Sequence, residues 1–166
     1  RETNLFLSVI STLNENWFER DKWDEKTRTA VDKYKDTFYR KNYFDYSLIM
    51  QEMLNQLENN KDFADIILSK IKYLTVDEYQ DTNPIQERLI HFIKQGGCNL
   101  CIVGDDDQTI YQFRGSDPEN ILTFRERYGI NKYIVLGTDY RSSEAIVDIG
   151  KRVIVNNAKR LPKVME

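Results

Sequence analysis

Cysteine and histidine are scarce in the 166-residue sequence, and long apolar runs are missing from it. Cys98, Cys101 and the single histidine, His91, cannot complete the ligand set of a structural zinc site. The C-x-x-C pair leaves a redox role open, but residues 99–103 are typical of a buried strand, so we expect two reduced core thiols and a cytoplasmic protein. No stretch approaches the ~18 consecutive apolar residues of a membrane-spanning helix, so we expect no membrane partner.

An excess of positive charge is also lacking. The 24 Lys and Arg residues are outnumbered by 27 Asp and Glu residues, and the formal net charge is −3. Proteins that coat nucleic acid through bulk electrostatics are strongly basic, so any nucleic-acid site in this chain must be local. The chain starts at Arg1 without a methionine or a signal peptide, and we therefore expect it to be part of something longer.

The sequence divides into a helical N-terminal segment and a larger segment of mixed helices and strands. In residues 1–42, apolar side chains recur at helical spacing in two runs: Leu5, Val9 and Leu13, then Val31, Tyr34 and Phe38. In residues 43–163, helices are predicted at 48–57, 62–72, 84–95, 117–129 and 143–153, and strands at 73–76, 99–103 and 133–136.

Short strands separated by helices of ten or so residues predict a parallel sheet with crossover helices, and hence an α/β fold. Proteins of this class bind ligands beyond the carboxyl ends of their strands. Each of the three predicted strands runs directly into a polar cluster. This coincidence is the first indication of function in the sequence.

The first cluster is the string VDEYQDTN at residues 76–83. An apolar strand that ends in Asp-Glu has the form of a Walker B site, in which Asp77 can hold Mg²⁺ through water. Glu78 beside it can orient the water that attacks a γ-phosphate. A bare Asp-Glu pair could equally end a strand at the surface, but the whole string is much less expected by chance.

The second cluster begins with three consecutive aspartates, residues 105–107, which repel one another unless they are solvated or lie near a cation. Both explanations remain open. Gln108 offers an amide that could sense a phosphate or a water. Tyr111, Phe113 and Arg114 bring two aromatic faces and a cation together, which suits stacking on unpaired bases with a phosphate contact. Core aromatics beside a surface arginine are the alternative.

The third cluster, GTDYRSS at residues 137–143, lies between a predicted strand and a helix. Arg141 could reach a transferring phosphate as an internal arginine finger, and Tyr140 could stack on a purine. Taken alone, the pair would equally fit a packed tyrosine beside an ordinary surface arginine.

In this order, the three strings resemble motifs II, III and IV of the UvrD/PcrA/Rep family of superfamily 1 DNA helicases: DEYQDTN, GDDDQTIYQFRG and DYRS. Residues 155–163 are similar to the segment that leaves the first motor domain of that family. The resemblance implies a partial RecA-like sheet of the P-loop NTPase type over residues 43–163. Residues 1–42 would then belong to an inserted helical subdomain, and residues 164–166 would begin a linker to the next domain.

The resemblance implies ATP and Mg²⁺ as cofactors, with five residues around them. Asp77 and Glu78 would serve the magnesium ion, and Glu78 would also be the catalytic base that orients the attacking water. Gln108 would contact the γ-phosphate region and couple it to DNA. Tyr140 would stack on adenine, and Arg141 would stabilise the charge on the γ-phosphate.

The resemblance also implies single-stranded and duplex DNA as partners, together with the remaining helicase domains of a parent chain. Tyr111, Phe113 and Arg114 would meet single-stranded DNA. Members of the family use ATP to move 3′ to 5′ along single-stranded DNA and to separate duplexes.

The phosphate-binding loop G-x-x-x-x-G-K-[ST] is missing from these 166 residues, which include only 7 glycines. Without its backbone N–H groups and its lysine, we expect no ATPase or unwinding activity from the chain alone. The main alternative is an ATPase-dead, helicase-derived module that binds nucleic acid or protein. A Mg²⁺-dependent nuclease using residues 77, 78 and 105–107 is a third hypothesis, although two-metal nucleases need carboxylates from several elements.

Overall fold

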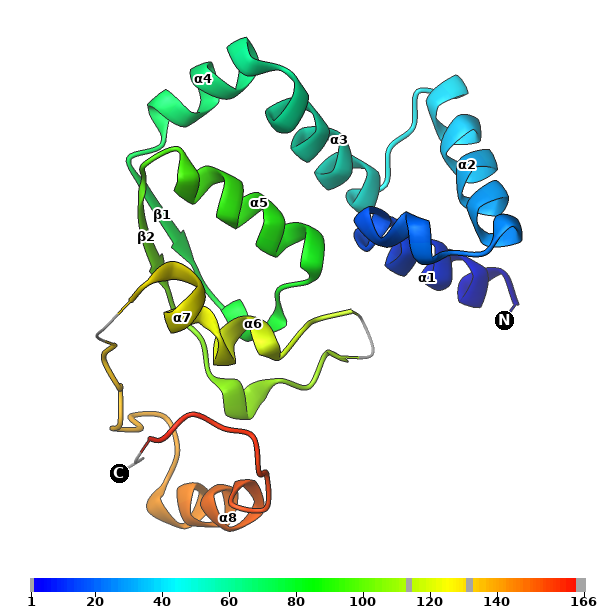
Figure 1. The fold of residues 1–166 in the computed structure, drawn as a ribbon. Coiled ribbons are helices and arrows are strands. Elements are labelled where there is room, and N and C mark those ends of the chain that lie inside the picture. The colour runs from blue at the N-terminus through cyan, green and yellow to red at the C-terminus, as the bar shows by residue number, and fades with distance from the viewer. Residues whose placement is uncertain (1, 113–114, 131–132, 164–166) are drawn as a thin grey trace.

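The computed structural model describes residues 2–112, 115–130 and 133–163 (Figure 1). Its elements, in chain order, are α1 (Glu2–Glu15), the 3-10 helix η1 (Trp17–Lys22), α2 (Glu25–Arg40), α3 (Tyr46–Asn59), α4 (Lys61–Lys70), β1 (Tyr73–Val76), η2 (Tyr79–Asp81), α5 (Pro84–Gln95), β2 (Asn99–Ile102), η3 (Asp106–Gln108), α6 (Glu119–Leu122), α7 (Phe124–Tyr128) and α8 (Glu144–Ile154). Within these residues, no helix is both long and apolar enough to cross a membrane.

The two helices predicted in the N-terminal segment are confirmed as α1 and α2. Asp24 caps α2 by accepting a hydrogen bond from the Thr27 N–H at 2.7 Å, and Asp45 caps α3 by accepting from the Leu48 N–H at 2.7 Å. Such caps satisfy backbone donors that the first helical turn leaves unpaired. Val31 and Leu48 are fully buried, so α2 and α3 both contribute to the core of this part of the molecule.

The strands β1 and β2 form a parallel pair joined by the crossover helix α5, as the sequence predicts. Their register places Tyr73 opposite Asn99 and Val76 opposite Ile102. The start of α5 is fixed by Asn83, whose side chain takes part in a capping box with the next helical turn, and Pro84 occupies the first turn. Because the strands are parallel, their carboxyl ends lie at one edge of the sheet.

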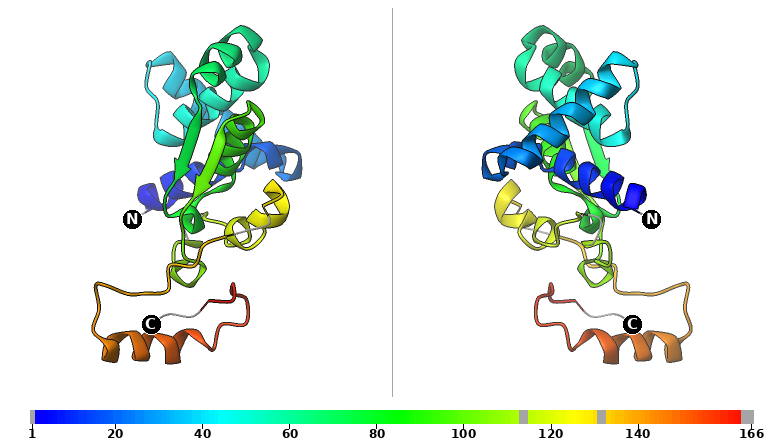
Figure 2. Two further views of the ribbon diagram at one scale, coloured as in Figure 1. Left: turned by 90° about the vertical axis from the view of Figure 1, so that its left-hand side faces the viewer. Right: turned by 90° about the vertical axis from the view of Figure 1, so that its right-hand side faces the viewer.

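Within the part of the chain that the structure describes, only one face of this sheet is covered. The inward side chains of both strands pack against a core of residues from η2, α5, α6 and α7: Tyr79, Ile90, Ile121 and Phe124. Figure 1 shows the helices on one side of the strands, and the left view of Figure 2 shows the strands from the open side. Tyr73, Thr75 and Cys101 are exposed there.

The expectation of a buried second strand with two core thiols is therefore half wrong. Cys98 and Cys101 are both free, but Cys98 is buried and Cys101 is exposed. Side chains alternate between the two faces of a strand, and no element among the described residues covers the face that bears Cys101.

The predicted third strand at residues 133–136 is also wrong, because this segment is not part of the sheet among the described residues. Ile134 and Leu136 are 88% and 78% exposed. Tyr133 makes local contacts instead, with the Arg125 guanidinium 4.9 Å from its ring centre and its hydroxyl donating to the Pro162 carbonyl at 3.3 Å. An apolar run specifies a strand only where a neighbouring edge is available for its hydrogen bonds.

The remaining helix predictions hold, with one change. The helix expected over 117–129 is divided into α6 and α7 at Thr123, whose hydroxyl donates to the Glu119 carbonyl at 2.6 Å. Side-chain bonds of this kind compete with the helical backbone pattern. Helix α8 forms where predicted, but its apolar side chains Ile149 and Val153 are 64% and 67% exposed.

Candidate functional site

The first two polar clusters lie side by side at the carboxyl edge of the sheet. The Val103 N–H donates to the Val76 carbonyl at 2.8 Å, and the Tyr79 N–H donates to the Val103 carbonyl at 3.0 Å. These bonds continue the pairing of the strands by one step beyond β1 and β2. Asp77 and Glu78 are thereby brought next to the start of the second cluster, which begins at Gly104.

Asp77 and Glu78 project from this edge as exposed carboxylates. Glu78 has a left-handed backbone, with φ 49° and ψ 42°, which is uncommon for a residue with a side chain. Its N–H donates to the Asp77 carboxylate at 2.9 Å, and its own carboxylate accepts a hydrogen bond from Gln80 Nε2 at 2.7 Å. The turn therefore orients the two acidic groups separately.

The donor set at this edge fits a hydrated Mg²⁺. That ion keeps several of its waters and takes one or two carboxylates, which the exposed pair can offer. A cage made wholly of protein ligands is not formed, since the described residues contain no group of three or more His, Cys, Asp or Glu side chains that could hold a metal ion. The carboxylates that the nuclease hypothesis requires are thus not gathered into one such group.

The buried side chain of Gln80 links the two clusters through hydrogen bonds. Its side chain is 1% exposed, its Oε1 accepts a hydrogen bond from the Asp105 N–H at 3.0 Å, and its Nε2 donates to Glu78. A Cβ at Gly104 would stand 2.7 Å from Gln80 Oε1 and 2.9 Å from Ile121 Cδ1. Gln80 is not among the predicted site residues; the only sign of it in the sequence is its place between the acidic pair and the next helix.

The segment of residues 105–108, here named the aspartate loop, is organised by Asp105. Its carboxylate caps η3 by accepting from the Asp107 N–H at 3.1 Å. The same carboxylate accepts from Gln108 Nε2 at 2.7 Å. Gln108 is exposed, so its amide lies at the surface of the edge while being held at one end by Asp105.

A cation accompanies the three aspartates, which decides between the two explanations left open by the sequence. Lys163 Nζ forms ion pairs with Asp105, with Asp106 at 2.6 Å and with Asp107 at 3.0 Å. Arg160 adds two bonds to Asp107, at 3.0 and 2.6 Å. Neither basic residue is among the predicted site residues. Three adjacent aspartates do signal a need for a cation, but not which one.

The pKa values of the charged groups in this cluster are set by two opposing effects, burial and pairing with groups of opposite charge. Burial alone would raise the pKa of Asp105, but hydrogen bonds from Lys163 and Gln108 outweigh it and hold that pKa below its usual range. Burial alone would lower the pKa of Lys163, but its three carboxylate partners outweigh that effect and raise it. Both groups therefore remain charged around neutral pH.

A buried network anchors η2 to the helices behind the sheet. Glu87 of α5 accepts hydrogen bonds from Tyr79 at 2.5 Å, from Tyr128 at 2.9 Å and from Arg127 at 2.5 Å. Burial and the hydrogen bond to Glu87 raise the pKa of the Tyr79 phenol, which stays protonated as a donor. The network fixes the turn from which Asp77 and Glu78 project.

The third cluster is not joined to the other two. Tyr140 is 94% exposed and Arg141 is exposed, and within the described residues no hydrogen bond or ion pair links either side chain to the first two clusters. The Asp139 carboxylate accepts from the N–H groups of Arg141 and Ser142 at 2.7 and 3.0 Å, and these bonds lower its pKa. Asp139 thus shapes the turn.

Of the predicted DNA-contacting residues, Tyr111 is described and exposed, whereas Phe113 and Arg114 lie outside the described residues.

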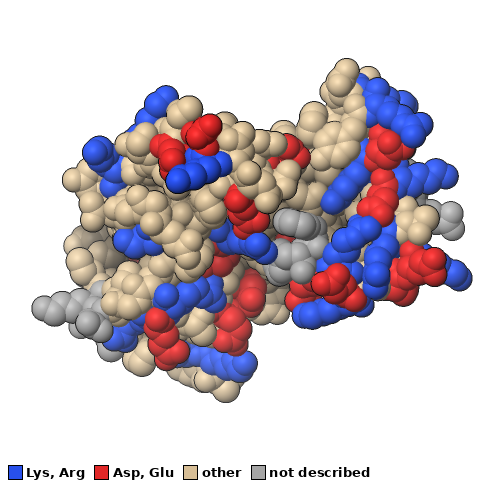
Figure 3. All heavy atoms as spheres, turned by 45° about the horizontal axis from the view of Figure 1, so that its top comes forward, with Lys and Arg blue, Asp and Glu red and all other residues tan. Residues whose placement is uncertain are grey.

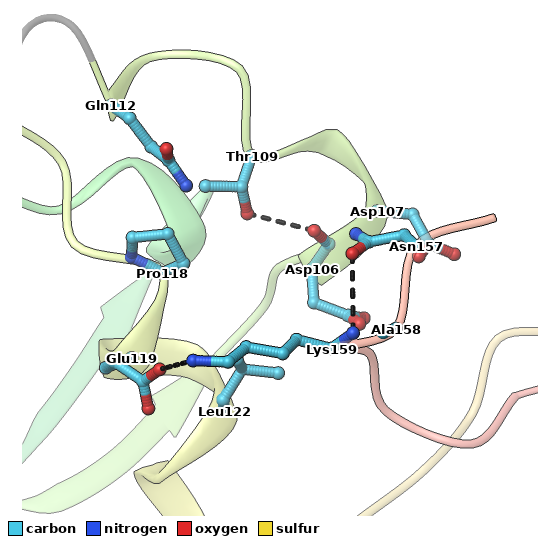
Figure 4. A pocket seen from close by; sticks show the side chains of 10 residues that line it. All are labelled: Asp106, Asp107, Thr109, Gln112, Pro118, Glu119, Leu122, Asn157, Ala158 and Lys159. Carbon is cyan, nitrogen blue, oxygen red and sulfur yellow. Dashed lines mark hydrogen bonds and ion pairs between the residues drawn. The ribbon is translucent and has the colours of Figure 1, made fainter.

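A pocket of about 370 Å³ opens between the aspartate loop, α6 and the C-terminal segment (Figure 4). Lys159 Nζ pairs with Glu119 at 3.2 Å along one side of it. Over the face shown in Figure 3, basic and acidic side chains are interspersed.

These features define an α/β protein with a parallel sheet and polar groups gathered beyond the carboxyl ends of its strands. The family model of the UvrD/REP helicase N-terminal domain matches residues 3–129, and this chain belongs to that family. The match includes the first two clusters and ends before the third. The resemblance inferred from the three motifs is confirmed.

Similarity to individual proteins extends beyond the residues matched by the family model. The chain is similar to the ATP-dependent DNA helicase PcrA of Staphylococcus aureus, at 35% identity over 170 residues. PcrA of Staphylococcus epidermidis matches with the same 35% identity. In both cases the alignment covers 98% of this chain, and the chain spans 23% of the length of the relative.

Proposed function

We propose that this chain is a piece of the first motor domain of an ATP-dependent DNA helicase, which moves 3′ to 5′ along single-stranded DNA and separates duplexes. Residues 43–163 would form part of a RecA-like domain of the P-loop NTPase type. Residues 1–42 would belong to an inserted helical subdomain, and residues 164–166 would begin a linker. The observation that supports this best is the meeting of the first two clusters at one sheet edge.

The proposed chemistry divides between Asp77 and Glu78, the adjacent acidic pair of the first cluster. Asp77 would hold Mg²⁺ through water, assisted by Glu78, and the ion would neutralise charge on the phosphates. Glu78 would accept a hydrogen bond from the attacking water and orient it. The bond from Gln80 Nε2 occupies one oxygen of that carboxylate, Oε2, and leaves Oε1 for this task.

The second and third clusters would serve the γ-phosphate, the nucleotide and DNA. Gln108 would contact the γ-phosphate region, and Tyr140 and Arg141 would meet adenine and the phosphate charge. Their exposure suits side chains that act on a ligand or on another domain. Tyr111, with Phe113 and Arg114, would contact single-stranded bases.

The chain by itself should not hydrolyse ATP, because the phosphate-binding loop and its lysine do not occur in the 166 residues. The first two clusters offer carboxylates and amides to the metal and the γ-phosphate. They do not supply the series of backbone N–H groups with which a phosphate-binding loop surrounds the phosphates.

The test compares the 166-residue chain with the longer helicase proposed to contain it. Single-stranded DNA should stimulate ATP hydrolysis by the longer protein. Glu78→Gln should lower kcat by at least about a hundredfold, since the general base contributes on that order. Binding of a non-hydrolysable ATP analogue should persist.

The control is Glu58→Gln, which removes a surface carboxylate paired with Arg88 at 2.8 Å and should leave kcat unchanged. Sustained hydrolysis by the short chain would refute its inactivity. A longer protein that binds DNA without hydrolysing ATP would instead establish the alternative, an ATPase-dead binding module.

A further inference from the structure

Among the described residues, Gln80 is the buried polar side chain whose hydrogen bonds join the first two clusters of the proposed site. Its amide is used at both ends, donating to Glu78 and accepting from the Asp105 N–H. The side-chain carboxylate of Asp105 in turn accepts from Gln108 Nε2, so the carboxylate of Glu78 is connected to the amide of Gln108 through Gln80 and through the backbone and side chain of Asp105.

The packing around Gln80 shows that its position is closely defined. The side chain is 1% exposed, and Gly104 leaves the space for its Oε1, because a Cβ there would stand 2.7 Å away. Real Cβ atoms do not approach a neighbour so closely. A planar amide held at both ends and enclosed in this way has one orientation, with its N–H₂ group toward Glu78 and its oxygen toward Asp105.

The hydrogen bond from Gln80 matters for the orientation of the Glu78 carboxylate because of the backbone conformation of Glu78. The residue is in the left-handed region, at φ 49°, and its side chain is exposed. An exposed carboxylate on such a turn has several rotamers available unless a partner restrains it. The 2.7 Å bond from Gln80 Nε2 is the side-chain contact that selects one of them.

We propose that Gln80 is a positioning residue that couples Glu78 to the aspartate loop, so that a displacement of Gln108 changes the orientation of the catalytic carboxylate. This inference rests on the proposed function, in which Glu78 orients the attacking water and Gln108 contacts the γ-phosphate region and DNA. Through Gln80, the binding of single-stranded DNA near the loop would reach the base without any contact between DNA and Glu78.

A positioning role predicts a particular pattern of kinetics. Substrate binding is left intact, while the reacting groups are less well aligned, so kcat falls and KM for ATP does not rise. A merely structural role would instead lower thermal stability and affect kcat, KM and DNA affinity together.

The experiment measures ATP hydrolysis by the longer helicase, with and without single-stranded oligonucleotide, for Gln80→Glu. This substitution keeps the size of the side chain and an oxygen that can accept from Asp105, and it replaces the donor to Glu78 with a carboxylate. We expect kcat with DNA to fall at least about tenfold, KM for ATP to stay within about twofold, and stimulation by DNA to be mostly lost.

The matched control is Gln56→Glu. Gln56 of α3 also donates its amide to a glutamate, Glu52, at 2.8 Å, but it lies outside the site. This variant should keep the kinetic constants of the unsubstituted protein. The control therefore shows whether an effect of Gln80→Glu depends on the position of the new charge in the site, since the chemical change is the same in both variants.

A second variant, Gly104→Ala, crowds Gln80 Oε1 and also Ile121 Cδ1 without altering any charge. It should reproduce the fall in kcat, and combining it with Gln80→Glu should give less than the sum of the two effects, because both act through one contact. Unchanged kcat in both single variants would overturn the inference, as would a parallel loss of kcat, ATP affinity and thermal stability in Gln80→Glu. If the unsubstituted longer protein lacks DNA-stimulated hydrolysis, the proposed function itself fails, and the role of Gln80 with it.

Discussion

Lys163 should be a principal source of stability at the sheet edge, and Lys163→Gln tests this. The lysine side chain is 12% exposed and pairs with three aspartates, of which Asp106 is 5% exposed and Asp105 is 31% exposed. The glutamine retains some length and hydrogen bonding but removes the charge. Arg160 still faces Asp107 in the variant, so the loss falls mainly on Asp105 and Asp106.

The magnitude follows from how far each pair is buried. Breaking a buried ion pair costs about 3–5 kcal/mol, because a charge is left without compensation, whereas an exposed pair contributes about 0–1 kcal/mol. The Asp106 pair is close to the first case, and the Asp105 pair lies between the two. We therefore expect Lys163→Gln to lower the free energy of unfolding of the 166-residue chain by about 2–3 kcal/mol.

The assay is urea denaturation at neutral pH, repeated at decreasing pH. The folded-state pKa of Asp105 lies below its unfolded value, so its contribution is present above about pH 4 and is lost as the pH falls through the folded pKa. The difference between Lys163→Gln and the unsubstituted chain should shrink over that acidic range. The control is Lys151→Gln, whose partner Asp148 is 3.6 Å away at the surface.

Lys151→Gln should change the free energy of unfolding by less than about 0.5 kcal/mol. Equal stability of the Lys163→Gln variant and the unsubstituted chain at neutral pH would refute the reasoning. So would a deficit that persists undiminished after the aspartates are protonated, since the penalty would then not come from their charge.

Three further predictions concern the packing around the site. Glu87→Leu removes the acceptor shared by Tyr79, Tyr128 and Arg127, and it should cost about 3 kcal/mol or more in urea denaturation, because these donors lose their buried partner. Asn83→Ala removes the capping box of α5 and should cost about 1 kcal/mol in the same assay; a change near zero would contradict the role of the cap. Ile134→Glu, at a side chain 88% exposed, should alter stability by less than about 0.5 kcal/mol while reducing any self-association seen by sedimentation velocity.

Features that depend on a few neighbouring residues were predictable from the sequence. The start of α5 is an example, since Asn83 and Pro84 determine it through contacts within one helical turn. Strands β1 and β2 were predictable for a related reason, because a crossover helix between two short apolar runs leaves little choice but a parallel pair. From this pairing followed the meeting of the first two clusters at one edge.

Features that depend on distant residues were not predictable. The contact of Lys163 with the three aspartates spans 56–58 residues along the chain, and no local pattern indicates it. The failure at 133–136 has the same origin, since an apolar run does not reveal whether a strand edge is available to it. The role of Gln80 was not predicted because a glutamine between two charged motifs has the same sequence pattern as any polar surface residue. The roles of the individual site residues remain predictions.

The different exposure of Cys98, just before β2, and Cys101, within β2, gives the protein a chemical reporter of its own. Cys98 is buried and Cys101 is exposed on the uncovered face of the sheet, and both are reduced. A thiol-specific reagent should therefore modify the native chain at a single position and reach the second thiol only on unfolding. In a longer protein or a complex, the rate at which Cys101 reacts would measure how completely that face of the sheet is covered, without any engineered label.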